Sequence, residues 1–201
     1  MSRVAFIDVQ NTETTANKLL GFVIDWRKMH AYLADKWQCE KIFFYSGIQQ
    51  GNDSLIQEYE ELAKLGYAMR AKPFFIYKNK DSVINIKCPN CSTGINHTIE
   101  GGVKWKSNCD VELTVDAEKY ASPHTEFLIF TGDGDFEYLM RDLVEKGVKI
   151  YIASSARKSR IGPRYFTSRF SSKLRELIKE KRGKVNFIDL NDWKYRIKKD
   201  L

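Results

Sequence analysis

Two carboxylates that follow an apolar run are the residues of this chain best suited to chemistry. Asp133 and Asp135 stand in the segment Thr-Gly-Asp-Gly-Asp, directly after the run 127–130. A helical pattern and a second apolar run, 148–153, come next, which is the order of a βαβ unit. Ligands of open α/β sheets bind at the carboxyl ends of strands, and oxygen-only clusters suit Mg²⁺ or Mn²⁺. The alternative is that the aspartates only cap the helix.

Other acidic residues occupy comparable positions. Asp8 ends a predicted strand and Asp110 opens a predicted helix. Carboxylates at one rim of a parallel sheet repel one another unless a cation joins them. A divalent ion held there would activate water and stabilise charge on a phosphodiester oxygen. Asn11 is placed to donate to a phosphate or to orient Asp8, and Asp116 is a further candidate ligand, with simple surface exposure as its alternative.

The elements that must position these residues alternate along the chain. Helices are predicted at 24–37, 53–65, 110–120 and 171–181, with a short one from 191, and strands at 3–9, 40–45, 67–73, 127–130, 148–153 and 184–190. Strands alternating with helices predict an α/β fold with a mostly parallel central sheet flanked by helices. We therefore expect one domain, 1–201, with a β-hairpin insertion at 78–106, a basic loop at 154–165, and a basic helix–strand–helix part over 155–201.

The charge distribution is uneven. The net charge is +7, but residues 155–201 hold 15 Lys and Arg against 5 Asp and Glu, a balance of +10, which leaves −3 for the first 154 residues. A basic region beside an acidic body suggests a polyanion held next to a metal site; solvated helix faces are the alternative. The apolar run Val4–Ile7 is too short for a signal peptide and no run is long enough for a membrane span, so we expect a cytoplasmic protein with no membrane partner.

Basic residues interleaved with aromatic ones predict contact with a single strand of nucleic acid, because cations hold the backbone while rings stack on bases. The alternative is that the rings pack inward and only the cations face solvent. The candidates are Arg157, Lys158, Arg160, Arg164, Tyr165 and Arg169, with Lys104 and Lys106 of the insertion on the opposite wall.

Cys88-Pro-Asn-Cys91 is half of a structural zinc site, which requires four ligands. His97 and Cys109 are the candidates to complete it, at an irregular spacing. The interpretation that we favour is a pair of reduced thiols in a hairpin turn, since reduced thiols are the rule in the cytosol.

Taken together, the motifs resemble the NYN domains, also called LabA-like, which are PIN-like metal-dependent ribonucleases. The resemblance spans nearly the whole chain with its motifs in order. Two positions depart from the family pattern: Val9 replaces a frequent glycine, and Ser107-Asn108 replaces Lys-Gly before Asp110. The matching segments are FIDVQN from Phe6, IDWRK from Ile24, KSNCDVELTVD from Lys106, TGDGDF from Thr131, GVKI from Gly147, and SSKLRELI with VNFIDL near the end.

This resemblance implies a PIN-like, Rossmannoid fold in which Asp8, Asp110, Asp133 and Asp135 bind Mg²⁺ or Mn²⁺ and Asn11 supports them. It implies an endoribonuclease that leaves 5′-phosphate and 3′-hydroxyl ends on RNA with a single-stranded region. No glycine-rich phosphate loop follows the first strand, so no nucleotide cofactor is expected. The alternatives are a non-catalytic RNA-binding or adaptor module of the same fold, and a metal-dependent phosphohydrolase of small substrates, which the basic tail disfavours. A homo-oligomer is left open.

Overall fold

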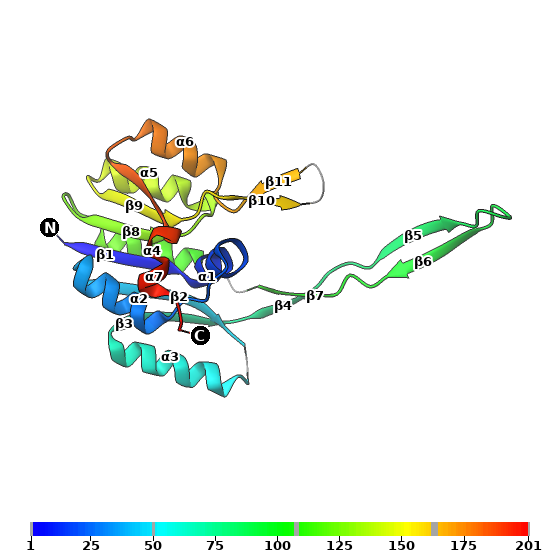
Figure 1. Ribbon diagram of the computed structural model, residues 1–201, viewed down its shortest axis with the longest axis horizontal. Helices are drawn as coiled ribbons and strands as arrows, with labels where there is room; N and C mark the ends of the chain where they lie inside the picture. Colours follow the sequence, from blue (N-terminus) through cyan, green and yellow to red (C-terminus); the bar gives the residue numbers. More distant parts are fainter. Residues whose placement is uncertain (1, 50, 107–108, 162–164, 201) are drawn as a thin grey trace.

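A six-stranded, fully parallel sheet forms the centre of the molecule in the computed structural model (Figure 1). The structure describes residues 2–49, 51–106, 109–161 and 165–200, and the side chains of 75–76, 103–106, 159–161 and 165–167 lie outside the description. The α/β fold predicted from the alternating pattern is confirmed. In spatial order the strands are β12 (Val185–Asp189), β9 (Lys149–Ser154), β8 (Glu126–Phe130), β1 (Arg3–Asp8), β2 (Lys41–Ile48) and β3 (Tyr67–Pro73).

The chain winds in two directions from the middle of this sheet. From β1 it proceeds to β2 and β3 on one side, and the second half adds β8, β9 and β12 on the other side. The switch point lies between β1 and β8, which pair from Arg3–Glu126 to Ile7–Phe130. Loops at the carboxyl ends of these two strands leave toward opposite faces, and such a crevice is where open α/β sheets bind ligands.

Helices cover both faces because the side chains of each strand alternate between them. Val4 and Phe6 of β1 belong to one buried cluster, and Ala5 and Ile7 belong to the other. The first face is covered by α4 (Asp110–Tyr120), α5 (Glu137–Glu145) and α6 (Ser172–Glu180). The second face is covered by α1 (Val9–Thr14), α2 (Trp26–Ala31), α3 (Asp53–Leu65) and α7 (Lys194–Ile197).

Two predicted segments differ in the structure. The helix expected over 24–37 begins at Trp26, because the Asp25 carboxylate caps it by accepting from the backbone N–H groups of Arg27 and Lys28. It widens into a π-helical turn over Tyr32–Lys36. Ile24 instead bridges to Lys198. The basic loop expected over 154–165 contains a second hairpin, β10 (Lys158–Ile161) with β11 (Tyr165–Ser168). The strands of this hairpin lack the alternation of apolar and polar residues that indicates a strand in a sequence.

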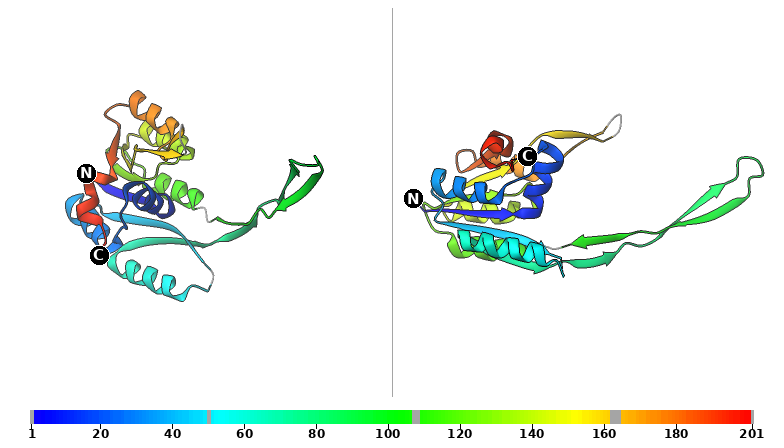
Figure 2. Two further views of the ribbon diagram at one scale, coloured as in Figure 1. Left: turned by 45° about the vertical axis from the view of Figure 1, so that its right-hand side comes forward. Right: turned by 60° about the horizontal axis from the view of Figure 1, so that its bottom comes forward.

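The predicted insertion is a long antiparallel ribbon that projects away from the body (Figures 1 and 2). Its base pairs β4 (Phe75–Lys78) with β7 (Val103–Lys106), and its outer part pairs β5 (Ser82–Lys87) with β6 (Gly94–Ile99). The ribbon and the β10–β11 hairpin leave the body from the same end, the one at which the sheet strands terminate (Figure 1). No helix within the described ranges is long and apolar enough to cross a membrane.

Candidate active site

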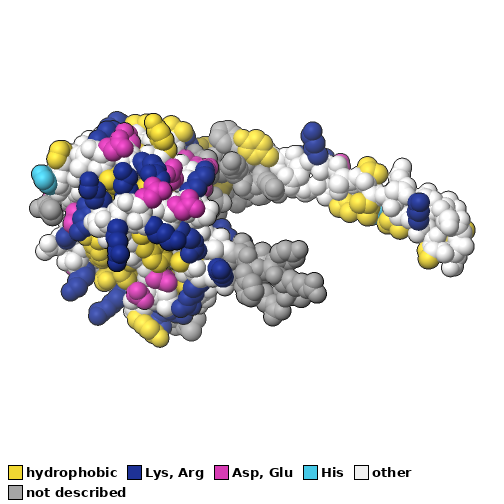
Figure 3. Space-filling model, turned by 90° about the horizontal axis from the view of Figure 1, so that it is seen from above, with side chains coloured by type: hydrophobic (Ala, Val, Ile, Leu, Met, Phe, Trp, Pro, Cys, Tyr) yellow, Lys and Arg dark blue, Asp and Glu magenta, His cyan; other side chains and the backbone are white. Residues whose placement is uncertain are grey.

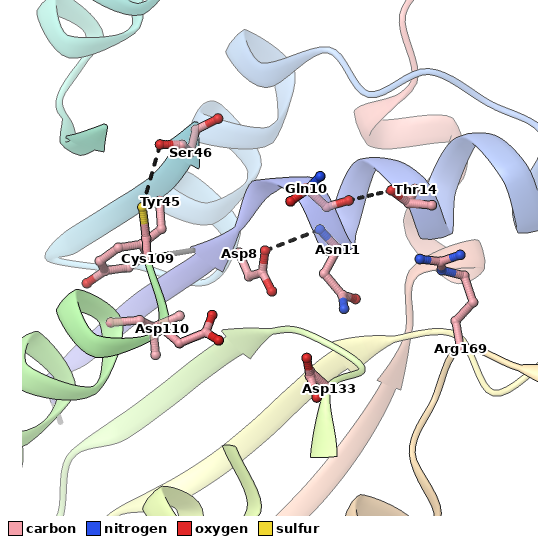
Figure 4. Close-up of a pocket in the computed structure, with 11 residues that line it drawn as sticks. Asp8, Gln10, Asn11, Thr14, Tyr45, Ser46, Cys109, Asp110, Asp133 and Arg169 are labelled. Carbon is pink, nitrogen blue, oxygen red and sulfur yellow. Dashed lines mark hydrogen bonds between the residues drawn. The ribbon is translucent and has the colours of Figure 1, made fainter. Parts of the chain in front are cut away.

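Three carboxylates from different parts of the chain line one cavity of about 250 Å³ at the switch point. Asp8 comes from the end of β1, Asp110 from the start of α4, and Asp133 from the turn after β8. Their carboxylate groups project toward a common space (Figure 4). Helix α4 brings Asp110 there because it runs against the strand direction, so that its first residue lies at the carboxyl edge of the sheet. The remaining lining residues are Gln10, Asn11, Thr14, Tyr45, Ser46, Cys109, Leu113 and Arg169.

Asp8 is fixed by hydrogen bonds to both carboxylate oxygens. Its Oδ1 accepts from the backbone N–H of Asn11 at 3.2 Å and so caps α1, while its Oδ2 accepts from the Thr131 hydroxyl at 3.3 Å. Burial raises the pKa of Asp8 to about 6, the Asn11 N–H opposes this shift, and the charges of Asp110 and Asp133 add to it. Ionised Asp8 is therefore costly in this cavity without a cation.

The turn after β8 is tied to α1 and to the segment before α6. The side-chain oxygen of Asn11 accepts from the backbone N–H of Gly132 at 3.0 Å, and Asp133 accepts from the N–H of Asp135 at 3.0 Å. Neither glycine of this turn has room for a side chain. A Cβ on Gly132 would lie 2.5 Å from the Arg169 carbonyl oxygen, and one on Gly134 would overlap the hydroxyl of Ser171. This close approach places Arg169 beside the carboxylates.

The other predicted acidic residues lie around the cavity rather than in it. Asp135 lines two neighbouring pockets, one shared with Asp110 and Val115 and the other with Asp133 and Arg169. Asp116 is buried on α4 and does not line the cavity; it accepts from Arg70 Nε at 2.8 Å and from the Tyr45 hydroxyl at 3.2 Å. Its contacts are those of a structural ion pair.

The side chains of most of the predicted RNA-binding cations are not among those that the structure describes. Arg164 is not among the described residues, and nothing is described of the side chains of Lys104, Lys106, Arg160 and Tyr165. Arg157 and Lys158 are exposed at the start of the β10–β11 hairpin, and Arg169 follows its end. Lys173, which sequence reasoning missed, lines the pocket that Arg169 shares with Asp133. Lys173 lies at the start of the helix predicted over 171–181, and nothing in that pattern indicated that its side chain would lie near Asp133.

The four candidate zinc ligands do not converge. Cys88 and Cys91 lie at the tip of the ribbon, whereas Cys109 is buried in the body with its Sγ 3.6 Å from the carbonyl oxygen of Ser46. Across the described residues, no three His, Cys, Asp or Glu side chains are grouped closely enough to hold a metal ion. The cavity nevertheless suits Mg²⁺ chemically, because its ligands are oxygens and Mg²⁺ needs only one or two carboxylates besides its waters.

The protein is a doubly wound α/β domain with carboxylates at its switch point. The chain belongs to the NYN domain family, whose profile matches residues 3–169. Members of this family are generally PIN-like nucleases. The chain is 24% identical over 158 residues to the low amplitude and bright protein LabA of Synechococcus elongatus, covering 77% of this chain and 74% of that protein. It is similar in fold to a crystal structure of a protein of unknown function from Vibrio parahaemolyticus, with a TM-score of 0.60, 20% identity, and coverage of 95% of this chain and 94% of that one.

Proposed function

We propose that this protein is a divalent-metal-dependent endoribonuclease that hydrolyses RNA phosphodiester bonds. The observation that supports the proposal is the joint position of Asp8, Asp110 and Asp133 around one cavity at the switch point of an NYN domain. Like charges that share one cavity repel one another, and burial makes ionised Asp8 more costly still, so a cation placed between the carboxylates would stabilise them. An oxygen-only set of this kind favours Mg²⁺ or Mn²⁺.

One or two of the three aspartates would bind the cation directly, and the remaining carboxylates, with Asp135 at the rim, would contact it through bound water. When bound, the cation would supply an activated water and charge stabilisation on a phosphate oxygen. Asn11 keeps the two halves of the site in register, since its backbone bonds Asp8 and its side chain bonds the turn that carries Asp133. Asp116 belongs to the support of the site, through Tyr45, which lines the cavity.

The substrate we infer is RNA with a single-stranded region. Arg169 lines the cavity itself and, with Lys173, the pocket next to it, so a phosphate group beside the carboxylates would meet positive charge. Exposed Arg157 and Lys158 add positive charge at the start of the β10–β11 hairpin. An extended basic surface suits a polymer that offers a phosphate at every nucleotide, whereas a small phosphoester would use only one such contact.

Cleavage of end-labelled single-stranded RNA, measured with Mg²⁺, with Mn²⁺ and with EDTA, tests this function. We expect cutting with either metal and none with EDTA. Asp133→Asn should abolish it, and because asparagine caps helices as well as aspartate, the turn should be preserved. Glu145→Gln, an exposed carboxylate on α5, is the matched control and should cleave like the wild type.

The alternatives give different results in the same assay. Salt-sensitive RNA binding without metal-dependent cutting would identify a non-catalytic RNA-binding or adaptor module. Turnover of a small phosphoester without affinity for RNA would identify a phosphohydrolase. Cleavage that persists in Asp133→Asn would refute the assignment of the site, and loss of cleavage in Glu145→Gln would show that the assay reports general damage.

A further inference from the structure

Two thiols share one turn at the tip of the ribbon. Cys88 follows β5 and Cys91 comes three residues later. The turn is closed by two hydrogen bonds, from the Cys88 N–H to the Thr93 carbonyl oxygen at 3.0 Å and from the Ser92 N–H to the Cys88 carbonyl oxygen at 2.9 Å. Both thiols are free, Cys91 is exposed, and its thiol donates to the Thr93 hydroxyl oxygen at 3.3 Å, within the same turn. Two cysteines separated by two residues in a tight turn are half of the ligand set of a structural zinc ion.

The other described residues of the same chain do not complete this ligand set. Cys109 is buried in the body. His97 lies opposite Ile84 in the ribbon, three residue pairs back from the pair formed by Lys87 and Gly94 that flanks the turn. No third His, Cys, Asp or Glu joins the two thiols in the part of the chain that is described. A structural zinc ion takes four ligands, so two must come from another molecule.

We propose that two copies of this chain meet at their ribbon tips and share one zinc ion, bound by Cys88 and Cys91 of each copy. Zinc binds thiolates, so each of the four thiols gives up its proton on binding. The resulting centre, one Zn²⁺ and four thiolates, carries a charge of −2. Lys87, exposed and adjacent to Cys88, brings one positive charge from each copy and offsets it.

The surface of the ribbon indicates a second copy as the partner. The register of β5 and β6 places four isoleucines on one face together with Ser82 and His97, because residues opposite each other and two apart share a face. These isoleucines are between 40% and 62% exposed, and hydrophobic side chains gather along the ribbon in Figure 3. The four residues are Ile84, Ile86, Ile95 and Ile99.

A two-stranded ribbon is at best marginally stable until one face is covered. The ribbon projects clear of its own body in every view (Figures 1 and 2), so the cover must come from elsewhere. The isoleucine face carries no Lys, Arg, Asp or Glu, which removes the attraction that a nucleic acid would need. The same face on a second copy matches it, and a two-fold axis brings identical patches together. Contact at the tips also keeps two bodies of like net charge apart.

Zinc content and molar mass of the full-length protein, measured together, test the proposal. The protein is purified with a reductant, saturated with zinc, freed of unbound metal, and analysed by elemental analysis and sedimentation equilibrium from low micromolar to several hundred micromolar. We expect one zinc ion per two chains, a dimer with zinc, and a monomer after chelation. Cobalt in place of zinc should give the spectrum of a tetrahedral four-sulfur site. Cys91→Ser should lower zinc affinity more than about tenfold, since a lost ligand leaves the site one short, and should abolish the dimer.

Two controls keep the result specific. Cys39→Ala removes a thiol of the body and should retain both zinc and the dimer. Ile86→Lys places a charge on the isoleucine face beside Cys88, whereas Val83→Lys places one on the opposite face; only Ile86→Lys should weaken the dimer. One zinc ion per monomer, a Cys88–Cys91 disulfide in the zinc-treated protein, absence of bound zinc, a dimer that survives chelation, or equal effects of the two lysine substitutions would each overturn the proposal. None of these outcomes depends on whether the protein cleaves RNA.

Discussion

Replacing Asp8 with asparagine should stabilise the metal-free protein near neutral pH while it disables the candidate site. Asparagine keeps an oxygen that can accept from the Asn11 N–H, and its amide can donate to the Thr131 hydroxyl, so the local hydrogen bonds can be preserved. What disappears is a charge that the cavity disfavours. Burial and the neighbouring carboxylates of Asp110 and Asp133 raise the pKa of Asp8 from 3.8 to about 6.

The sign and size of the effect follow from linkage. A carboxyl whose pKa is higher in the folded than in the unfolded state binds its proton more tightly when folded, so its contribution to stability is present at low pH and is lost as the pH rises through about 6. A shift of about 2 units corresponds to roughly 3 kcal/mol. Of this, roughly 2 kcal/mol should be lost between about pH 4.5 and about pH 7.5. The Asp8→Asn variant has no such loss.

Urea denaturation of both proteins in EDTA at the two pH values measures this difference. We expect the free energy of unfolding of Asp8→Asn, relative to the wild type, to be roughly 2 kcal/mol larger at the higher pH than at the lower one. Glu145→Gln, which removes an exposed carboxylate, should show no such change. Added Mn²⁺ should then stabilise the wild type more than the variant. An equal effect of Asp8→Asn on stability at both pH values would refute the reasoning, because it would show that the cavity does not raise the pKa of Asp8.

Three further substitutions probe the surroundings of the cavity. Arg169→Ala should weaken RNA binding and reduce the salt dependence of the binding constant by about one ion, without changing metal affinity. If the slope of the logarithm of the binding constant against the logarithm of the salt concentration is unchanged, Arg169 does not contact RNA. Gly134→Ala should destabilise the fold by about 1–3 kcal/mol in thermal melts, because its Cβ overlaps Ser171, and Ser171→Gly in the same chain should recover most of the loss. Asp116→Ala should cost about 1–3 kcal/mol in urea denaturation, since it leaves the Nε–H of Arg70 and the buried Tyr45 hydroxyl without this acceptor. An effect within about 0.5 kcal/mol would show that the ion pair is unimportant.

The sequence was most informative where local pattern and chain order act together. Apolar runs that end in aspartate mark the ends of buried strands, and parallel strands share one edge, which is why Asp8 and Asp133 could be placed near each other without a structure. The same reasoning could not give the strand order. The switch between β1 and β8 arises from pairing between residues more than a hundred positions apart, which no local pattern encodes.

Side-chain direction and polar hairpins were the parts that could not be read from the sequence. Asp133 and Asp135 are two residues apart, yet only Asp133 lines the cavity, because a 3₁₀ turn beginning at Gly134 carries Asp135 away. The approach of Arg169 depends on backbone contact between two segments that the sequence does not connect. Strands β5 and β6 were expected only as part of a hairpin, since alternation gives each strand an apolar face but not the distance that the ribbon reaches.

The dispersal of the three carboxylates along the chain has a consequence for how the proposed activity can be lost. Asp8 sits at the end of the central strand, with β8 on one side and β2 on the other, and Asp110 and Asp133 belong to separate later segments. Any fragment that ends before residue 133 or begins after residue 8 lacks part of the centre, and Asp8 is held on a strand that is paired on both sides. Heat inactivation of the proposed nuclease should therefore coincide with cooperative melting of the sheet, so that the proposed activity would report the folded population.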